Sequence, residues 1–223
     1  MQYGQFNVDY EQRPYNPERM RKERWAKLQA SMKKWGLGAL LLYDYDYHRY
    51  AGFYSFHQYA RRRPGTYCLV VAGEEVPYVN YDKYPGNWEE LRMPWFKDHF
   101  LFHSSRPYQL MNGLPEHPEA MRENYKLNVR EILPVLQKHG VADMPVGCDI
   151  ISPLMIDVLR EGGINIVDGS IAMVDAITQK TDDEIFCLKM AGVITDAAHW
   201  ECATSMRPGQ TELEIAGIAA NAT

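Results

Sequence analysis

Residues 36–43 read Gly-Leu-Gly-Ala-Leu-Leu-Leu-Tyr, and this stretch decides the fold class. Its apolar part is a short run bounded by turn residues, which predicts a buried strand. Before it, residues 17–35 carry apolar side chains at three- and four-residue spacing, which is typical of an amphipathic helix. Asn16 suits the cap of that helix, Pro17 suits its first turn, and Gly36 is a stop signal. A helix, a glycine stop and a buried strand in succession indicate an α/β fold.

The same alternation of helices and strands continues along the chain. Two β-rich runs flank residues 72–75, which read as a hairpin turn. A helix over 118–139 contains Pro134, which should kink it, and a later helix begins at Ser152 and ends at Gly162. The predicted strands after the first are 66–71, 76–81, 145–149 and 164–168. Three irregular segments are also predicted: an arm over 1–16, a loop over 44–52 and a long, partly ordered excursion over 82–118. The arm is expected to be disordered or to lie over a neighbour.

The pattern changes near residue 176, after which two helices are predicted. Thr181-Asp182-Asp183-Glu184 is a capping box, in which the Thr hydroxyl and the Glu carboxylate satisfy backbone N–H groups at the helix start. Arg207-Pro208-Gly209 ends that helix, and Thr211-Glu212-Leu213-Glu214 is a second capping box. The last helix has no stop signal before Thr223, so we expect the chain to be truncated.

Composition excludes several classes of protein. The chain has 223 residues, 46% of them hydrophobic, which is enough for a packed core, and 24 basic against 29 acidic side chains. The net charge of -5 gives no reason to expect nucleic-acid binding, and no apolar run is long enough for a membrane span or a secretory signal. Scattered cysteines predict reduced thiols of a cytoplasmic protein rather than a zinc site; they are Cys68, Cys148, Cys187 and Cys202.

Several short motifs together resemble the creatinase, prolidase and aminopeptidase P (Xaa-Pro peptidase) family. The Arg-Pro-Gly-x-Thr-Glu element matches well, whereas the family's junction sequence lacks its Arg here and is slightly altered in spacing. The aromatic arm before the first helix is also similar to dimethylsulfoniopropionate lyase-like members. The motifs lie, in order, at residues 19–42, 50–53, 176–185, 197–199 and 207–214.

The resemblance implies a fold and a domain organisation. It implies an N-terminal arm over 1–16 and then, over 17–175, a creatinase-like α/β domain with a ribonuclease H-like mixed sheet and flanking helices. Residues 176–223 would be the incomplete start of a pita-bread metallohydrolase domain. The full-length protein would be a cytoplasmic homodimer, a hydrolase or a lyase, acting on a peptide or another small molecule.

The resemblance also implies where the metal lies. In this family two Asp, one His and two Glu hold the metal, on strands further along the chain. The resemblance implies that the full-length protein binds Mn, Zn, Fe or Co. Nothing in this chain matches the ligand positions, so this chain alone would have no metal and no activity. For Asp182-Asp183-Glu184, helix capping is favoured over metal binding.

One segment is the main candidate for substrate binding, and it contains His57, Tyr59, Arg61, Arg62 and Arg63. In creatinase-like relatives the corresponding segment reaches into the partner subunit's active site. A guanidinium can bind a carboxylate through two hydrogen bonds, and a neighbouring aromatic ring can stack or donate. Two alternatives remain: a solvated basic run before a strand, or a non-catalytic α/β module that binds an anionic small molecule or a partner through these arginines.

The remaining candidates have more ordinary interpretations. Asp46 and His48 follow the first buried strand, where ligands often bind, but an exposed loop pair is favoured. A metal site at His99 and His103 is disfavoured because no third ligand is near in sequence, and His199 is expected in a core or an interface. Four alternating tyrosines favour a half-buried strand or a dimer surface over a binding cage; they are Tyr43, Tyr45, Tyr47 and Tyr50.

Overall fold

The computed structural model describes residues 15–52, 67–80, 99–101, 117–149 and 152–222. The chain divides into two compact units, one formed by residues 21–179 and the other by residues 1–20 with 180–223. Each unit is described below by itself.

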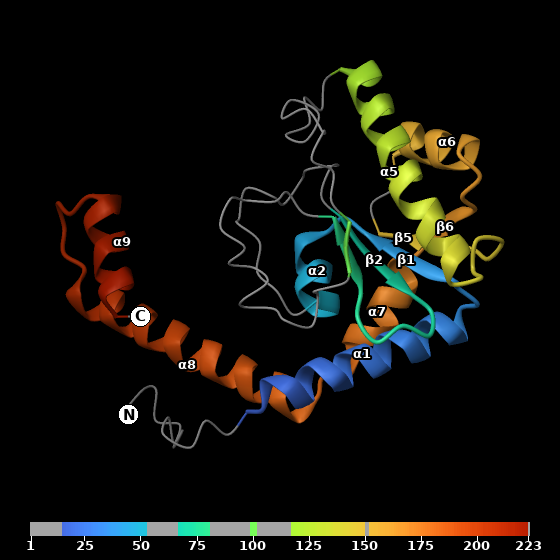
Figure 1. The fold of residues 1–223 in the computed structure, drawn as a ribbon. Helices are drawn as coiled ribbons and strands as arrows, with labels where there is room; N and C mark the ends of the chain where they lie inside the picture. The colour runs from blue at the N-terminus through green and yellow to red at the C-terminus, as the bar shows by residue number, and fades with distance from the viewer. Residues whose placement is uncertain (1–14, 53–66, 81–98, 102–116, 150–151, 223) are drawn as a thin grey trace. The chain divides into compact units, whose positions relative to one another are not determined.

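The larger unit contains a mixed β-sheet with six strands in the described residues (Figure 1). Their order across the sheet is β4-β3-β2-β1-β5-β6. Strand β1 pairs in parallel with β5 and antiparallel with β2, while β3 is antiparallel to β2 and parallel to β4. All strands except β2 therefore run in one direction. Their bounds are β1 Ala39–Leu42, β2 Tyr67–Val71, β3 Tyr78–Asn80, β4 Phe100–Leu101, β5 Val146–Cys148 and β6 Ile166–Asp168.

Helices cover both faces of this sheet, as Figure 1 shows. Because side chains alternate along a strand, Leu41 and Leu69 face one helical layer while Leu40 and Val70 face the other. Both strands β1 and β2 are therefore buried along their whole length. The first layer consists of α5 Pro118–Lys138 and α6 Pro153–Glu161; the second consists of α1 Pro17–Lys34, α2 Tyr45–Gly52 and α7 Ser170–Thr178.

The mixed α/β fold expected from the sequence is confirmed, including the predicted strands and the hairpin between β2 and β3. Asn16 caps α1 by accepting a hydrogen bond from the Arg19 backbone N–H at 3.0 Å, and Ser152 caps α6 in the same way through the Met155 N–H at 3.1 Å. Pro134 lies inside α5 as predicted, and the kink expected there stays a prediction.

Three elements differ from the sequence prediction. The loop predicted over 44–52 is wrong, because residues 45–52 form α2. Asp44 starts this helix by accepting backbone hydrogen bonds from Asp46 at 2.8 Å and from Tyr47 at 3.3 Å. Helix α7 was not predicted at all, and β4 lies inside the predicted excursion over 82–118. The arm is described only at residues 15 and 16.

The smaller unit contains α8 Asp182–Ser205 and α9 Glu212–Asn221. Both predicted capping boxes are present, at Thr181 with Glu184 and at Thr211 with Glu214. Asp183 is buried and accepts two hydrogen bonds from the Arg19 guanidinium, at 2.8 and 2.7 Å, and one from the Asn16 backbone N–H at 2.8 Å. Within the smaller unit, this carboxylate therefore joins residues 16 and 19 to the start of α8.

Candidate functional site

The carboxyl ends of the parallel strands lie together at one end of the sheet, along the strand direction, and β2 begins at the same end. We call this the carboxyl edge, and its described residues include Tyr43, Asp44, Tyr67, Asp149 and Asp168. Ligands of open α/β sheets commonly bind at such an edge. The side chains there are therefore the first candidates for a functional site.

Asp149 holds the end of β1 beside the end of β5. Its carboxylate accepts hydrogen bonds from the Tyr43 backbone N–H, at 2.8 and 3.0 Å to the two oxygens, and from the Asp44 N–H at 2.7 Å. A carboxylate that accepts backbone N–H groups makes strong, charge-assisted hydrogen bonds. Asp149 thus acts as a fixed cross-link between two strand ends.

The other two carboxylates at the carboxyl edge also bind backbone. Asp44 caps α2, and Asp168 accepts a hydrogen bond from the Ser170 backbone N–H at 2.8 Å where α7 begins. The Ser170 hydroxyl in turn donates to the Asp149 carbonyl at 3.4 Å. These acids therefore shape the edge and start its helices.

His48 is buried in α2, so the exposed loop position predicted for it is wrong; Asp46 is exposed as predicted, but it lies on the same helix rather than in a loop. Its Nε2–H donates to the Leu42 carbonyl at 2.5 Å. Burial lowers the pKa of His48 to about 4, against a smaller opposing effect of that hydrogen bond. The imidazole is consequently neutral at pH 7 and ties α2 to the end of β1.

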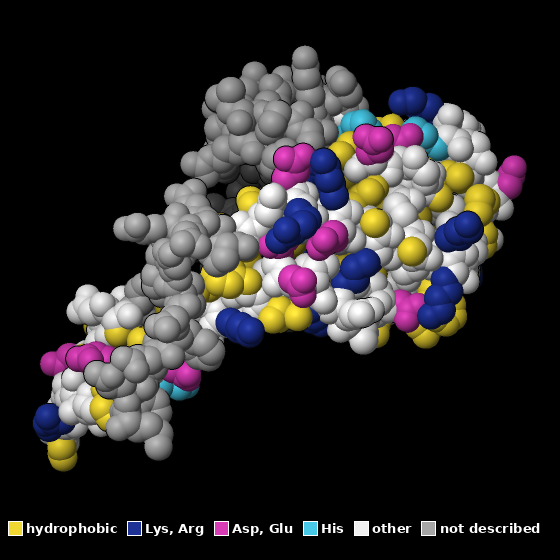
Figure 2. All heavy atoms as spheres, turned by 90° about the horizontal axis from the view of Figure 1, so that it is seen from below, with side chains coloured by type: hydrophobic (Ala, Val, Ile, Leu, Met, Phe, Trp, Pro, Cys, Tyr) yellow, Lys and Arg dark blue, Asp and Glu magenta, His cyan; other side chains and the backbone are white. Residues whose placement is uncertain are grey.

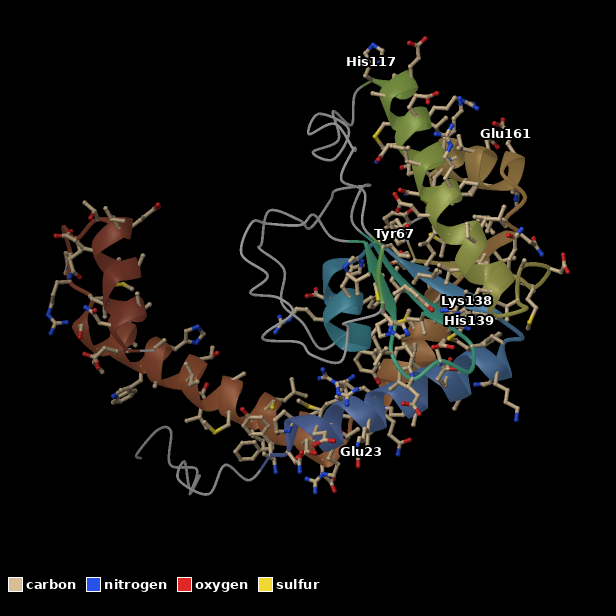
Figure 3. All side chains as sticks on the ribbon, in the orientation of Figure 1. Glu23, Tyr67, His117, Lys138, His139 and Glu161 are labelled. Carbon is tan, nitrogen blue, oxygen red and sulfur yellow. The ribbon has the colours of Figure 1, made fainter. Side chains whose placement is uncertain are left out.

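A layer of buried polar side chains lies between the carboxyl edge and α5. The Tyr43 hydroxyl accepts a hydrogen bond from Asn128 at 2.8 Å, and the Tyr67 hydroxyl donates to the buried Glu131 carboxylate. Figure 3 labels Tyr67 at the start of β2, and its ring lies 6.0 Å from that of Tyr43. Burial raises the pKa of Tyr43 well above its ordinary value, so its hydroxyl stays protonated.

The alternating tyrosines have mainly structural contacts. Tyr43 and Tyr50 are buried, and the Tyr50 hydroxyl donates to the Ala176 carbonyl at 2.9 Å, which joins α2 to α7. Tyr47 is half-buried, and the side chain of Tyr45 lies outside the described residues. The described tyrosines therefore serve the core.

The substrate-binding segment predicted from the sequence lies outside the described residues, and this applies to each of its five members, His57, Tyr59, Arg61, Arg62 and Arg63. Its described neighbours are Gly52, at the end of α2, and Tyr67, at the carboxyl edge.

The other histidines considered in the sequence are His99, His103 and His199. His99 precedes β4, His103 lies outside the described residues, and His199 is exposed on α8. Within the described residues, no group of three or more His, Cys, Asp or Glu side chains is arranged to hold a metal ion. Across the same residues, no helix combines the length and the apolar character that a membrane span requires.

The fold of this chain is similar to that of several solved structures. No protein-family model matches the chain, and no curated protein is significantly similar in sequence. Among solved structures, the chain is similar to an Xaa-Pro dipeptidase from Bacillus anthracis, with a TM-score of 0.58 and 16% identity, over 93% of this chain and 48% of that one. Dipeptidase PepE from Mycobacterium ulcerans gives 0.57 and 19% over 92% and 49%, and recombinant prolidase from Thermococcus sibiricus gives 0.61 and 15% over 91% and 49%.

The chain thus spans about half the length of the solved structures that it matches. At these identities the likeness establishes the fold, which is shared with part of each dipeptidase or prolidase chain. The α/β fold that the family resemblance implies is thereby confirmed.

Proposed function

We propose that this chain is the N-terminal part of a metal-dependent enzyme of the creatinase, prolidase and aminopeptidase P type. Residues 17–175 would be its N-terminal domain and residues 176–223 the start of its catalytic domain. The observation that carries the proposal is the extent of the structural likeness, which reaches 93% of this chain but 48% of the Xaa-Pro dipeptidase chain. The whole enzyme would cleave peptides as a soluble cytoplasmic homodimer, with divalent metal bound by residues beyond those of this chain.

The apolar side chains of α8 and α9 support the proposal. Leu188 is 58% exposed and Leu213 is 83% exposed, and α9 contains no buried residue. Helices with exposed apolar faces are usually covered by further structure. A catalytic domain built onto these two helices would supply that cover.

The role proposed for the larger unit is to dimerise and to close the active site of the partner subunit. His57, Tyr59 and the three arginines that follow would contact the substrate, with one guanidinium on a substrate carboxylate. The segment leaves α2 at Gly52 and returns at Tyr67, and both residues are fixed to the core. Binding residues on a segment between rigid elements are a common arrangement.

The test is an assay of the complete reading frame that contains this chain. We expect hydrolysis of an Xaa-Pro dipeptide that depends on added Mn²⁺, Zn²⁺ or Co²⁺, and no stoichiometric metal binding by residues 1–223 alone. Replacing Arg61, Arg62 or Arg63 singly by Ala should raise KM by about tenfold at the residue that holds the carboxylate, because charge-assisted hydrogen bonds are strong. Lys33→Ala, at an exposed position on α1, is the matched control.

Different results would overturn different parts of the proposal. Tight, stoichiometric metal in residues 1–223 would show that the ligands lie in this chain. Unchanged kinetics in all three arginine variants would remove the segment's role but not the family assignment. A stable product that ends at Thr223 and binds small anions would favour the non-catalytic module instead.

A further inference from the structure

Five titratable side chains gather at the opposite end of the sheet from the carboxyl edge, where β3 and β4 begin. We call them the Glu74 cluster: Glu74, Tyr78, His99, Lys138 and His139. One carboxylate joins two of its members, because Glu74 Oε1 lies 2.8 Å from His139 Nδ1 and Glu74 Oε2 lies 3.4 Å from His99 Nε2. Figure 2 shows histidine side chains beside acidic ones at one margin of the face seen there.

Tyr78 extends the cluster toward α5. Its hydroxyl lies 2.8 Å from His139 Nε2 and accepts a hydrogen bond from Lys138 at 3.3 Å. Figure 3 labels Lys138 and His139 together where α5 ends. The Tyr78 ring also contacts His99, with 4.6 Å between ring centroids.

Glu74 is fixed independently of His99. Its backbone carbonyl accepts hydrogen bonds from Trp25 at 2.7 Å and from Gln29 at 3.4 Å, both on α1. Its side chain is held by His139 at the end of α5. The carboxylate therefore keeps its place whether or not His99 is bound.

Strand β4, in contrast, has few contacts with the other described residues. It has two residues, which pair with Val79 and Asn80 of β3, and the Val79 N–H donates to the His99 carbonyl at 2.9 Å. Leu101 is only partly buried against the core. So short an edge strand has little backbone pairing of its own, which makes side-chain contacts a large share of what holds it.

We infer that β4 is a detachable edge strand and that Glu74 is the latch that holds it on β3. Opening would break the contacts of His99 with Glu74 and Tyr78 and the hydrogen bond from Val79, while β1, β2 and β3 stay paired. Proteins commonly open in such local units at less cost than global unfolding. Opening would expose the Val79 N–H to solvent, where its hydrogen can exchange.

Hydrogen exchange at single amides tests this inference on the chain as it stands. In Glu74→Gln one carboxylate oxygen becomes an amide that donates, so the side chain no longer accepts from both histidines. We expect the Val79 amide to exchange about tenfold faster, because the lost hydrogen bonds involve a charged group. The Leu41 and Leu69 amides, on the central strands, should keep their rates. Glu75→Gln, at the exposed neighbouring residue, is the control and should change none of them.

His99→Ala is the second variant, and it leaves the turn that contains Glu74 intact. It should speed exchange at Val79 to a similar extent, and it carries the test if Glu74→Gln does not fold. The inference is overturned if Val79 exchanges at its original rate in the folded variants. It is also overturned if Leu41 and Leu69 accelerate in step with Val79, because the cluster would then stabilise the whole sheet rather than latch one strand.

Discussion

Gly169 is the position at which we expect a single added methyl group to be most damaging. The residue follows β6, starts α7, and donates its backbone N–H to the Cys148 carbonyl at 2.8 Å. A Cβ atom placed on it would lie 2.6 Å from the Gly147 carbonyl carbon, 2.7 Å from the Cys148 nitrogen and 2.8 Å from the Gly147 Cα. All three are backbone atoms of β5.

The expected loss follows from how little these atoms can move. Ordinary van der Waals contacts of a Cβ atom begin at 3.4 Å, and β5 is hydrogen-bonded to β1 on one side and to β6 on the other. Overpacking a core costs about 1–3 kcal/mol, and we expect Gly169→Ala to lose about 3 kcal/mol because the clash is with three backbone atoms of one peptide unit in a central strand. At φ -100 the backbone of residue 169 suits any amino acid, so the loss is steric.

Urea unfolding followed by far-ultraviolet circular dichroism measures this loss. The control is Gly192→Ala in the interior of α8, where a Cβ atom would meet nothing within 4 Å. That variant should gain about 0.5–1 kcal/mol, since glycine is unfavourable inside a helix. A Gly169→Ala protein within about 0.5 kcal/mol of the parent, at an unchanged slope with urea, would refute the backbone contact as the reason for glycine at this position.

Two further predictions concern the dependence of stability on pH. The pKa of buried His48 is about 4, against 6.5 when exposed, so the unfolded chain binds more protons than the folded chain between these pH values. The free energy of unfolding should therefore fall by up to about 3 kcal/mol as pH drops from 6.5 to 4. In His48→Gln the free energy of unfolding, measured with urea at a series of pH values, should change less over this range, and an unaltered dependence on pH would contradict the burial argument. The Arg19 guanidinium lowers the pKa of Asp183 below its ordinary 3.8, so the ion pair stabilises the fold above that pH. This stabilisation is lost as pH falls through the lower pKa of the folded state. Asp183→Asn should remove the loss of stability in acid that this ion pair causes, and thermal unfolding between pH 2 and pH 5 measures it.

Local sequence signals were sufficient for most of the fold. Short strand-like runs predicted β1, β5 and β6, and capping boxes placed the starts of α8 and α9 within a residue or two. Helix α2 was missed because its residues are largely tyrosine and charged, so they lack an obvious apolar stripe. Asp44 was nevertheless a usable signal, since Asp is a favoured cap, and Asp168 before α7 was another.

The contacts at the carboxyl edge could not be predicted in this way. Asp149 and Tyr43 are 106 residues apart, and their hydrogen bond exists only because β5 pairs with β1. Likewise, His48 reads as an exposed loop residue until α2 turns it toward the end of β1. The Glu74 cluster draws on the β2–β3 turn, β3, the residue before β4 and the end of α5, so no spacing in the sequence indicates it.

Three acidic residues at the carboxyl edge bind backbone groups, and this bears on which residues of the larger unit we expect to bind a ligand. Asp44, Asp149 and Asp168 each accept backbone N–H groups, so each of these carboxylates already has a structural task at a strand end or a helix start. Loss of the Asp44 hydrogen bonds would loosen the start of α2, which is a described neighbour of the predicted binding segment. In the proposed arrangement these acids shape the edge, and the arginines between Gly52 and Tyr67 bind the ligand. This division of tasks is consistent with the proposal that substrate binding by the larger unit belongs to residues 57–63 rather than to the acids at the strand ends.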